Sequence, residues 1–308
     1  MWLVVLLACA QSDPTPFVVV SFNSGTTEGM AHDDAPDDGY TSEHATTSDR
    51  WYGDGLAWDR AITETTDFFA ELDPDVVVFQ EIFHSDLCTD IPADQHLDFV
   101  CQDWQPGDLT VAQTVLGDGW QVMCQLGKDD KCAAVKRSFG QFRGCDSDFC
   151  LEGLDGAVNE GCGGGSRLGR GVVELAVGGE FTLVNVHGNS GLTGDDEACR
   201  AAQVEQVFVD MDGEPAANGE RNIVLGDLNT DPGRWADFDA SAARWMDFVG
   251  GDSAFGWVTE IGPDAPPTYA SVANIDHVAS DTWTGDCEHP QFLDAVYFDH
   301  RPAVCTLY

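Results

Sequence analysis

Short runs of β-branched and aromatic residues alternate along the chain with longer segments whose apolar residues recur every three or four positions. Runs of about four to eight such residues, bounded by turn-forming residues, are typical of buried strands. Such runs predict strands at 17–22 (FVVVSF), 75–80 (DVVVFQ), 181–186 (FTLVNV) and 222–225 (NIVL). Strands are therefore expected along the whole chain.

Segments with helical spacing separate these runs. The first helix is expected from Trp58 to Leu72, and Asp73-Pro74 ends it because proline cannot continue a helix. Two more are expected at 198–211 and around 235–245. The apolar positions expected to face the core are Trp58, Ile62, Phe69 and Leu72 in the first helix, Val204, Val207, Phe208 and Met211 in the second, and Trp235, Phe238, Ala242 and Trp245 in the third. Helices between strands predict an α/β fold.

Other strands indicate that the sheets are not purely parallel. The strands expected at 132–137 and 171–177 follow no helix, and 292–298 with 302–307 resembles an antiparallel pair that closes a sheet. Mixed sheets are therefore expected.

Two long segments lack periodicity. The segment 25–55 is rich in Asp, Gly, Ser and Thr, which predicts a long acidic loop. The segment 144–171 is rich in Gly and Cys and predicts a cross-linked loop rather than a second domain. We expect one domain over 17–308, preceded by a signal and a short tether over 1–16.

The apolar run at 1–9 is far shorter than the roughly 20 residues that span a bilayer. Leu6-Leu7-Ala8-Cys9 resembles a bacterial lipobox, in which a signal peptide is cut before a cysteine that is then lipidated. No Lys or Arg precedes the run, so an ordinary signal peptide or a wrongly assigned start stays open. We expect an exported protein, either extracellular or an outer-surface lipoprotein of a bacterium, with membrane contact only through Cys9.

Cysteine usage agrees with export. Setting Cys9 aside leaves ten cysteines, with no CxxC pair that would indicate a structural zinc site. An even number in an oxidising compartment predicts disulfides, and we expect Cys124 to pair with Cys132 and Cys287 with Cys305.

The charge balance is extreme, with 54 acidic against 14 basic residues and a formal net charge of −40. A solvated acidic surface is typical of a protein working in salt, where screening over roughly 8 Å shortens the repulsion. A polyanionic substrate would therefore need salt, divalent cations or a local basic spot.

Polar residues follow the apolar strands at their carboxyl ends, six times along the chain. They are Asn23, Gln80-Glu81, His187-Gly188-Asn189, Asp227 with Asn229, Asp276-His277 and Asp299-His300. Ligands of α/β proteins bind at such strand ends, so one shared site is predicted. Mg²⁺ needs few protein oxygens, and Asn23, Glu81 and Asp299 would suffice. His187 and His300 would serve as acid and base, because imidazole titrates near neutral pH, and Asp276 could orient one of them.

The segments SFN, VFQE, NVHGN, LGDLN, NIDHV and FDHRP, in this order, resemble the successive signatures of the endonuclease/exonuclease/phosphatase superfamily. The superfamily includes deoxyribonuclease I, abasic-site endonucleases, bacterial sphingomyelinases and inositol-polyphosphate phosphatases. The resemblance implies a four-layer α/β/β/α sandwich with two mixed β-sheets and a site between loops of both. It matches Asn23 and Glu81 to the metal site. It also matches Asp227 and Asn229 to the pair that positions water and phosphate.

The same resemblance implies the remaining roles. His187 matches the general acid of deoxyribonuclease-like members, and Asp299-His300 the terminal motif, in which Phe298 replaces a serine. Asp276 would support either His187 or His300. Further candidates by position are Asp130 as an acidic partner of the base histidine, Arg170 as a phosphate contact with a structural role equally open, and Asn189 as a substrate contact.

The expected function is a metal-dependent phosphodiesterase, first of all an endonuclease, in which water attacks the phosphodiester in line. Mg²⁺ or Mn²⁺ is the expected cofactor, Ca²⁺ an alternative structural ion, nucleic acid the expected substrate, and a monomer the expected state. A sphingomyelinase or phospholipase C-like enzyme acting on phospholipid would share these residues but expose aromatics, for which Trp51 and Tyr52 or Trp283 are candidates. An inositol-phosphate phosphatase ranks lower, since no Lys/Arg cluster occurs. The remaining alternative is a surface binding module whose catalysis has lapsed.

Overall fold

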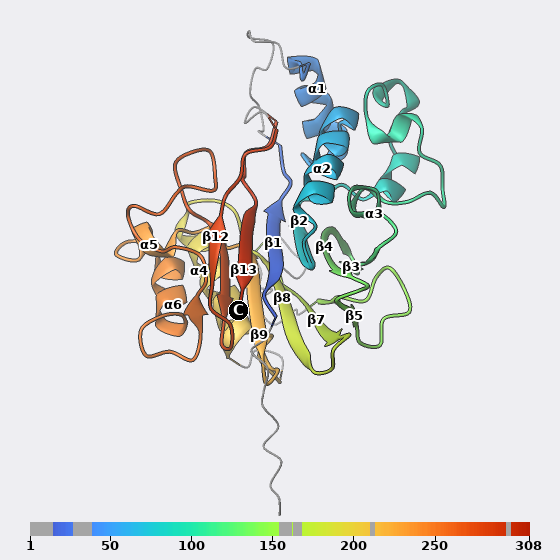
Figure 1. The fold of residues 1–308 in the computed structure, drawn as a ribbon. Coiled ribbons are helices and arrows are strands. Elements are labelled where there is room, and N and C mark those ends of the chain that lie inside the picture. Colours follow the sequence, from blue (N-terminus) through green and yellow to red (C-terminus); the bar gives the residue numbers. More distant parts are fainter. Residues whose placement is uncertain (1–14, 27–38, 154–161, 163–167, 210–212, 294–296) are drawn as a thin grey trace, which may run out of the picture.

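The computed structural model describes residues 15–26, 39–153, 162, 168–209, 213–293 and 297–308 (Figure 1). Its two β-sheets pack face to face. The predicted signal and lipobox lie outside the described residues. Within the described residues, no helix is both long enough and apolar enough to cross a membrane.

The first sheet has six strands in the order β12-β13-β1-β2-β4-β3. Their bounds are Gly285–Glu288 (β12), Ala303–Leu307 (β13), Phe17–Asn23 (β1), Val76–Gln80 (β2), Lys128–Lys136 (β4) and Trp120–Gln125 (β3). Only β1 and β2 run parallel, and the other neighbours are antiparallel. The sheet is therefore mixed, as expected.

The second sheet repeats this plan with the order β10-β11-β9-β8-β7-β5, and β6 pairs with β7. Its strands are Gly256–Trp257 (β10), Asp276–Ser280 (β11), Asn222–Asp227 (β9), Glu180–His187 (β8), Leu168–Leu175 (β7), Gly140–Phe142 (β5) and Glu152–Gly153 (β6). Here β8 and β9 form the parallel pair, flanked by antiparallel neighbours. Each sheet thus has one parallel pair near its centre.

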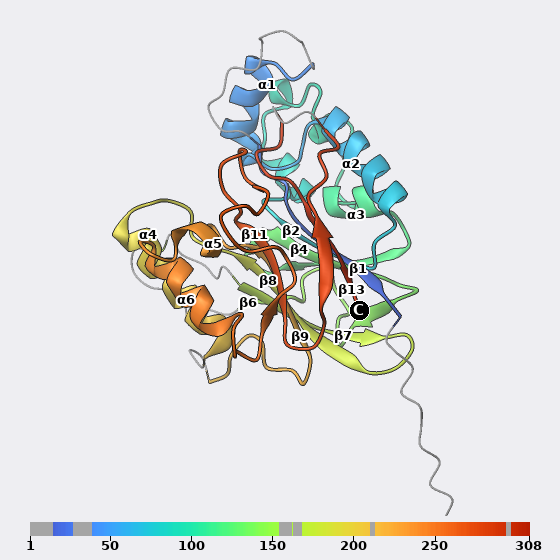
Figure 2. The same ribbon diagram turned by 60° about the vertical axis from the view of Figure 1, so that its left-hand side comes forward.

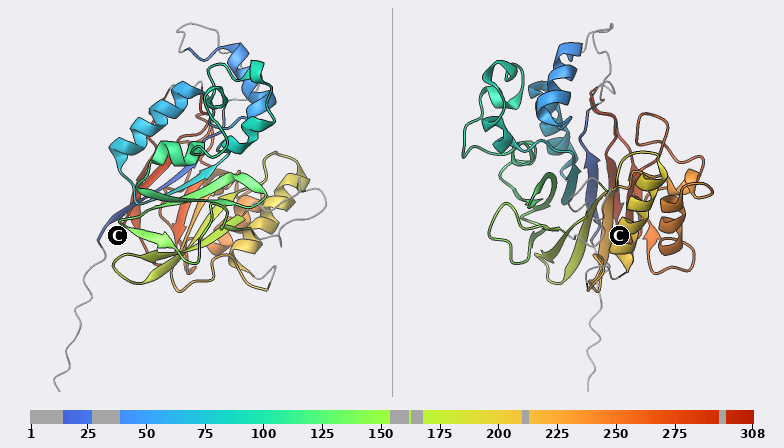
Figure 3. Two further views of the ribbon diagram at one scale, coloured as in Figure 1. Left: turned by 90° about the vertical axis from the view of Figure 1, so that its right-hand side faces the viewer. Right: turned by 180° about the vertical axis from the view of Figure 1, so that it is seen from behind.

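Helices cover the outer faces of the sandwich. Figures 2 and 3 show α2 and α3 over the first sheet and α4 and α6 over the second. The helices are Ser42–Thr47 (α1), Asp59–Leu72 (α2), Val111–Leu116 (α3), Gly194–Phe208 (α4), Pro232–Trp235 (α5) and Ala240–Phe248 (α6). A π-helix (η1) spans Ser48–Tyr52, and short 3₁₀-helices (η2, η3 and η4) span Ser85–Thr89, Ala93–Gln95 and Val100–Gln102. The predicted four-layer α/β/β/α sandwich is confirmed.

The strand sequences explain these layers, because successive side chains point to opposite faces. Val19 packs between the sheets with Leu183 and Ile223, whereas its neighbour Val20 packs with the helices over the first sheet. Val224 correspondingly faces the third apolar cluster beneath α4 and α6. Continuous apolar runs are needed here because each central strand is buried on both faces.

Three expectations about elements were wrong. The segment 25–55 is not a loop throughout, since α1 and η1 lie within it, and Thr41 caps α1 through the backbone N–H of His44. The helix predicted around 235–245 is two helices, α5 and α6, and Phe238 between them is 71% exposed. At 292–298, the described residues form no strand, and Phe298 makes only an isolated bridge to Thr26. The antiparallel partners of β13 are β1 and β12 instead.

Ten cysteines form five disulfides. These are Cys88–Cys101, Cys124–Cys132, Cys145–Cys150, Cys162–Cys199 and Cys287–Cys305. The second and the fifth confirm the predicted pairs. Disulfides in this number are typical of proteins that fold in an oxidising compartment.

Candidate functional site

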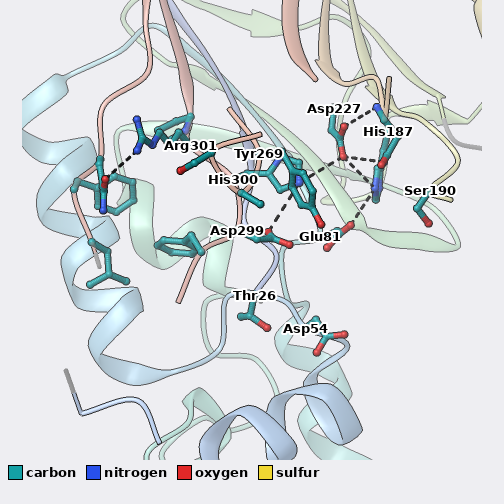
Figure 4. A pocket seen from close by; sticks show the side chains of 18 of the residues that line it. Thr26, Asp54, Glu81, His187, Ser190, Asp227, Tyr269, Asp299, His300 and Arg301 are labelled. Carbon is teal, nitrogen blue, oxygen red and sulfur yellow. Dashed lines mark hydrogen bonds and ion pairs between the residues drawn. The ribbon is translucent and has the colours of Figure 1, made fainter. Parts of the chain in front are cut away.

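The two parallel strand pairs end at the same edge of the sandwich. In the first sheet Asn23 is paired in register with Gln80, which directly precedes Glu81. In the second sheet His187 is paired with Asp227, and Asp276 lies opposite the same residue. The parallel pairs of both sheets present their carboxyl ends to one space (Figure 4), and Asp276 reaches it from the amino end of β11, which is antiparallel to β9.

A pocket of about 910 Å³ opens there. Among its lining residues are Glu81, His187, Asp227, Asn229, Asp299 and His300. Asn23 and Asp276 lie directly behind this lining as buried partners of Asp227 and His300.

His300 is held by a buried carboxylate. Its Nδ1 lies 2.7 Å from Oδ2 of Asp276, and its Nε2 lies 3.9 Å from Oδ2 of Asp227. Burial alone would lower the imidazole pKa, but Asp276 and Asp227 reverse this effect and raise the pKa of His300 to about 10. Of the two histidines, Asp276 therefore supports His300 and not His187.

His187 has a different partner. Its Nε2 lies 3.1 Å from Oε1 of Glu81 and 3.8 Å from Oδ2 of Asp227. Burial favours the neutral form of Glu81, but contact with His187 outweighs burial and lowers the pKa of Glu81 to about 2. Glu81 has a left-handed backbone (φ 57°), and a Cβ at Gly25 would clash with its Oε2. The carboxylate therefore depends on a glycine at position 25.

Asp227 connects the two histidines. Its Oδ2 accepts hydrogen bonds from the side-chain amides of Asn23 (3.0 Å) and Asn229 (2.9 Å), and its Oδ1 accepts one from the Asn229 backbone N–H (2.7 Å). Complete burial raises the pKa of Asp227 to about 6. Asn229 adopts the left-handed conformation (φ 51°) that folds its side chain back onto Asp227.

The residues present fit a divalent cation. Oδ1 of Asp299 is buried without a hydrogen-bond partner, and burial raises the pKa of Asp299 to about 7, with Glu81 and Asp227 adding to the effect. Buried oxygens of this kind are stabilised by a hard cation such as Mg²⁺ or Mn²⁺. Glu81, Asp299 and the amide oxygen of Asn23 would hold it.

A second grouping, of Asp227, Asp276 and His300, has ligand atoms within 4.8 Å of one another. However, Asp276 and His300 already hydrogen-bond each other, and Asp227 is bonded by the two asparagines. Each set contains one buried carboxylate oxygen without a hydrogen-bond partner, Oδ1 of Asp276 in this grouping and Oδ1 of Asp299 in the other.

Two predicted substrate contacts are not brought into the pocket. The guanidinium of Arg170 forms ion pairs with Glu152 and Glu214. Asn189 donates its side-chain amide to the Ser190 carbonyl and to Asp196 near the start of α4. Neither is part of the pocket lining, which includes Ser190 instead.

Several lining residues were not singled out from the sequence. The ring of Tyr269 lies 4.9 Å from that of His300, and Arg301 reaches the pocket beside Gln291. Arg301 belongs to the FDHRP segment, so a signal for it existed, whereas Tyr269 lies in a loop without one. Asp130, which was predicted as an acidic partner of the base histidine, also lines the pocket, but its carboxylate pairs with Lys131 at 2.7 Å.

Comparison with protein-family models and with curated protein sequences finds no match. Solved structures do match in fold. The catalytic domain of human Nocturnin with bound sulfate is 14% identical, with 95% of this chain and 93% of that one covered and a TM-score of 0.53. The mannosyl-6-phosphatase Bt3783 of Bacteroides thetaiotaomicron is 15% identical, with 95% and 99% covered and a TM-score of 0.51.

A third similar structure is the endonuclease/exonuclease/phosphatase from Beutenbergia cavernae. It is 17% identical, with 95% of this chain and 71% of that one covered and a TM-score of 0.54. Identities at this level establish the fold and not the reaction. Together with the two mixed sheets and their outer helices, these matches show that the chain has the fold of the endonuclease/exonuclease/phosphatase family.

Proposed function

We propose that this protein is a metal-dependent phosphodiesterase that hydrolyses nucleic-acid phosphodiester bonds, most readily as an endonuclease. The observation that supports this most strongly is the arrangement of the two histidines. Each contacts a carboxylate of its own, and their Nε2 atoms lie 3.8 and 3.9 Å from the same oxygen of Asp227. Two groups suited to proton transfer thus lie near one carboxylate oxygen, as a pair acting on a single phosphate would.

The chain's own residues would divide the chemistry as follows. Near neutral pH, His300 carries a proton on Nε2, because Asp276 and Asp227 hold its pKa at about 10, and it would donate a hydrogen bond to a phosphate oxygen. Asp227, with its pKa raised to about 6 by burial, would orient the attacking water and accept its proton. His187 would protonate the leaving oxygen. A divalent cation held by Glu81, Asp299 and Asn23 would supply charge to polarise the phosphoryl group.

The aromatic side chains favour nucleic acid over phospholipid. Tyr52 stacks on Phe99 and is 2% exposed, and Trp283 packs between Phe17 and Phe181 and is 6% exposed. Trp51 is partly buried against the core. Two of the three candidates for an aromatic membrane contact, Tyr52 and Trp283, are therefore buried in the protein, which weakens the sphingomyelinase or phospholipase C-like alternative.

The remaining parts of the proposal are the cellular setting and the oligomeric state. We propose that the protein is exported, because five disulfides suit an oxidising compartment, and the monomeric state is proposed from the sequence alone. Anchoring through Cys9 belongs to the same proposal and depends on the sequence alone.

The test is hydrolysis of single-stranded DNA, duplex DNA, RNA, sphingomyelin and a phosphomonoester in parallel, with Mg²⁺, Mn²⁺ or EDTA and over a salt series. Nucleic-acid cleavage that EDTA abolishes is the expected result. Turnover of sphingomyelin alone would establish the lipid alternative, and turnover of the monoester alone would make the protein a phosphatase. No turnover at all would favour the lapsed binding module.

A further inference from the structure

A second pocket adjoins the first. It has a volume of about 510 Å³ and shares Gly53, Glu81 and Asp130 with the pocket described above. A ligand that occupies both would therefore pass directly beside the carboxylate of Glu81. Volumes of several hundred Å³ are typical of pockets that bind small organic groups.

The lining of the second pocket combines three kinds of contact. Trp51 in η1 contributes a partly exposed indole, and Leu87 in η2 is 47% exposed. His84 is 5% exposed, and its Nδ1 has no hydrogen-bond partner within the described part of the chain, although Oδ2 of Asp86 lies 4.0 Å from it. A buried polar atom without a partner costs free energy unless a ligand or water satisfies it. The pocket therefore offers an aromatic surface, an imidazole nitrogen without a hydrogen bond and, through Lys128, a cation in a lining that also includes Glu81, Asp129 and Asp130.

Lys128 is one of five described cations without a carboxylate partner, the others being Arg50, Arg137, Arg221 and Arg301. Eight of the 14 Lys and Arg residues form ion pairs with carboxylates: Arg60, Lys131, Lys136, Arg143, Arg170, Arg200, Arg234 and Arg244. Within the described residues, Lys128 pairs with no carboxylate and neither does Arg301, and they line the second and the first pocket respectively. Arg50 lies over the ring of Trp51, at 4.9 Å from its centroid.

The distribution of these cations indicates the charge of the substrate. A surface of net charge −40 repels polyanions, so an anionic substrate is retained only where cations are free to contact it. Lys128 lines the second pocket and Arg301 the first, and Glu81 lines both. This arrangement suits a chain of phosphates that extends in both directions from the bond that is cleaved, and it gives no advantage to a substrate with a single phosphate.

We propose that the second pocket is a nucleotide subsite. In it, Trp51 and His84 contact the base next to the scissile phosphate, and Lys128 contacts the following phosphate. Aromatic side chains bind any base by stacking, and a base that enters a pocket must have left the stack of a duplex. The preferred substrate is accordingly single-stranded nucleic acid. This inference rests on the proposed function and extends it to the polymer that is cleaved.

The decisive variant is Lys128→Glu, with Arg137→Glu as its matched control. Both residues belong to the β4 segment, Lys128 at its first position and Arg137 directly after its last, and neither forms an ion pair within the described residues. We expect Lys128→Glu to lower kcat/KM for a pentathymidylate about tenfold or more. Hydrolysis of bis(p-nitrophenyl) phosphate, which has one phosphate, should be unchanged. Arg137→Glu should change neither.

Binding in EDTA separates this inference from the proposed function. The affinity for a fluorescein-labelled pentathymidylate, measured by anisotropy over a salt series, should fall in Lys128→Glu, with a salt slope about 0.7 smaller. Trp51→Leu should weaken binding at every salt concentration without changing the slope, whereas Trp51→Phe should retain it.

The outcomes are distinct. If the wild-type protein hydrolyses both substrates and Lys128→Glu keeps its affinity and slope, the subsite is wrong and the phosphodiesterase stands. If nothing is hydrolysed but Lys128→Glu weakens binding, the subsite stands and the catalytic proposal fails. Absence of both binding and hydrolysis overturns both.

Discussion

The two histidines of the pocket are held by partners of very different exposure. His300 bonds to Asp276, whose side chain is fully buried, whereas His187 contacts Glu81, whose side chain is 33% exposed and lies on the pocket wall. The first pair cannot rearrange without leaving a charge buried and unpaired. The second can exchange its contact for water, a cation or a substrate. The site therefore contains one histidine–carboxylate pair that is fixed, His300 with Asp276, and one that can exchange partners, His187 with Glu81.

The largest expected effects come from removing each histidine. His300→Ala should lower kcat about 10²–10⁴-fold and destabilise the fold by about 3–5 kcal/mol, since Asp276 loses its partner inside the protein. His187→Ala should lower kcat similarly but cost clearly less stability, because water can replace the imidazole at Glu81. Urea unfolding beside turnover measurements checks both, and equal losses of stability would contradict the distinction.

A smaller effect is expected when the pair of His187 and Glu81 is disturbed without replacing either member. In Gly25→Ala the new methyl group would meet Oε2 of Glu81 and turn the carboxylate away from His187. We expect kcat/KM to fall up to about 10²-fold, as for a misplacement of about 1 Å, with little change in stability. Gly119→Ala is the control, because a Cβ at Gly119 meets nothing within 4 Å. Full activity in Gly25→Ala would show that the position of Glu81 is not critical.

The smallest effect is a pH dependence of stability in EDTA. Asp276, Asp227 and Asp299 raise the pKa of His300 from 6.5 to about 10, so the folded protein binds this proton more tightly than the unfolded chain does. The stabilisation is fully present below about pH 6.5 and is lost as the pH rises towards 10. The difference in unfolding free energy between wild type and His300→Asn should shrink over this interval. A constant difference would mean that His300 is not charged in the folded protein.

Sequence reasoning located the strand-end residues because a short apolar run followed by a polar residue is a local signal. Asn23, Glu81, His187 and Asp227 do lie at the carboxyl ends of strands, whereas Asp276 begins the antiparallel strand β11 and His300 precedes β13 without following a described strand. The catalytic and metal-binding roles of these residues stay predictions.

What the sequence did not reveal depends on partners that lie far away along the chain. Ion pairs with Glu152 and with Glu214, which is 44 residues away, hold Arg170 outside the pocket. Likewise, whether 292–298 or 285–288 pairs with β13 depends on the register of the whole sheet. The helices within 25–55 were missed because α1 has a capping signal but no apolar periodicity.

The direction of β1 determines at which end of the domain the preceding chain is attached. The strand begins at Phe17 and ends in the pocket at Asn23, and at about 3.3 Å per residue its two ends are about 20 Å apart. Whatever precedes Phe17 therefore joins the molecule at the end opposite the pocket. An attachment on that side would leave the mouth of the pocket facing outward, open to long polymers that arrive from solution.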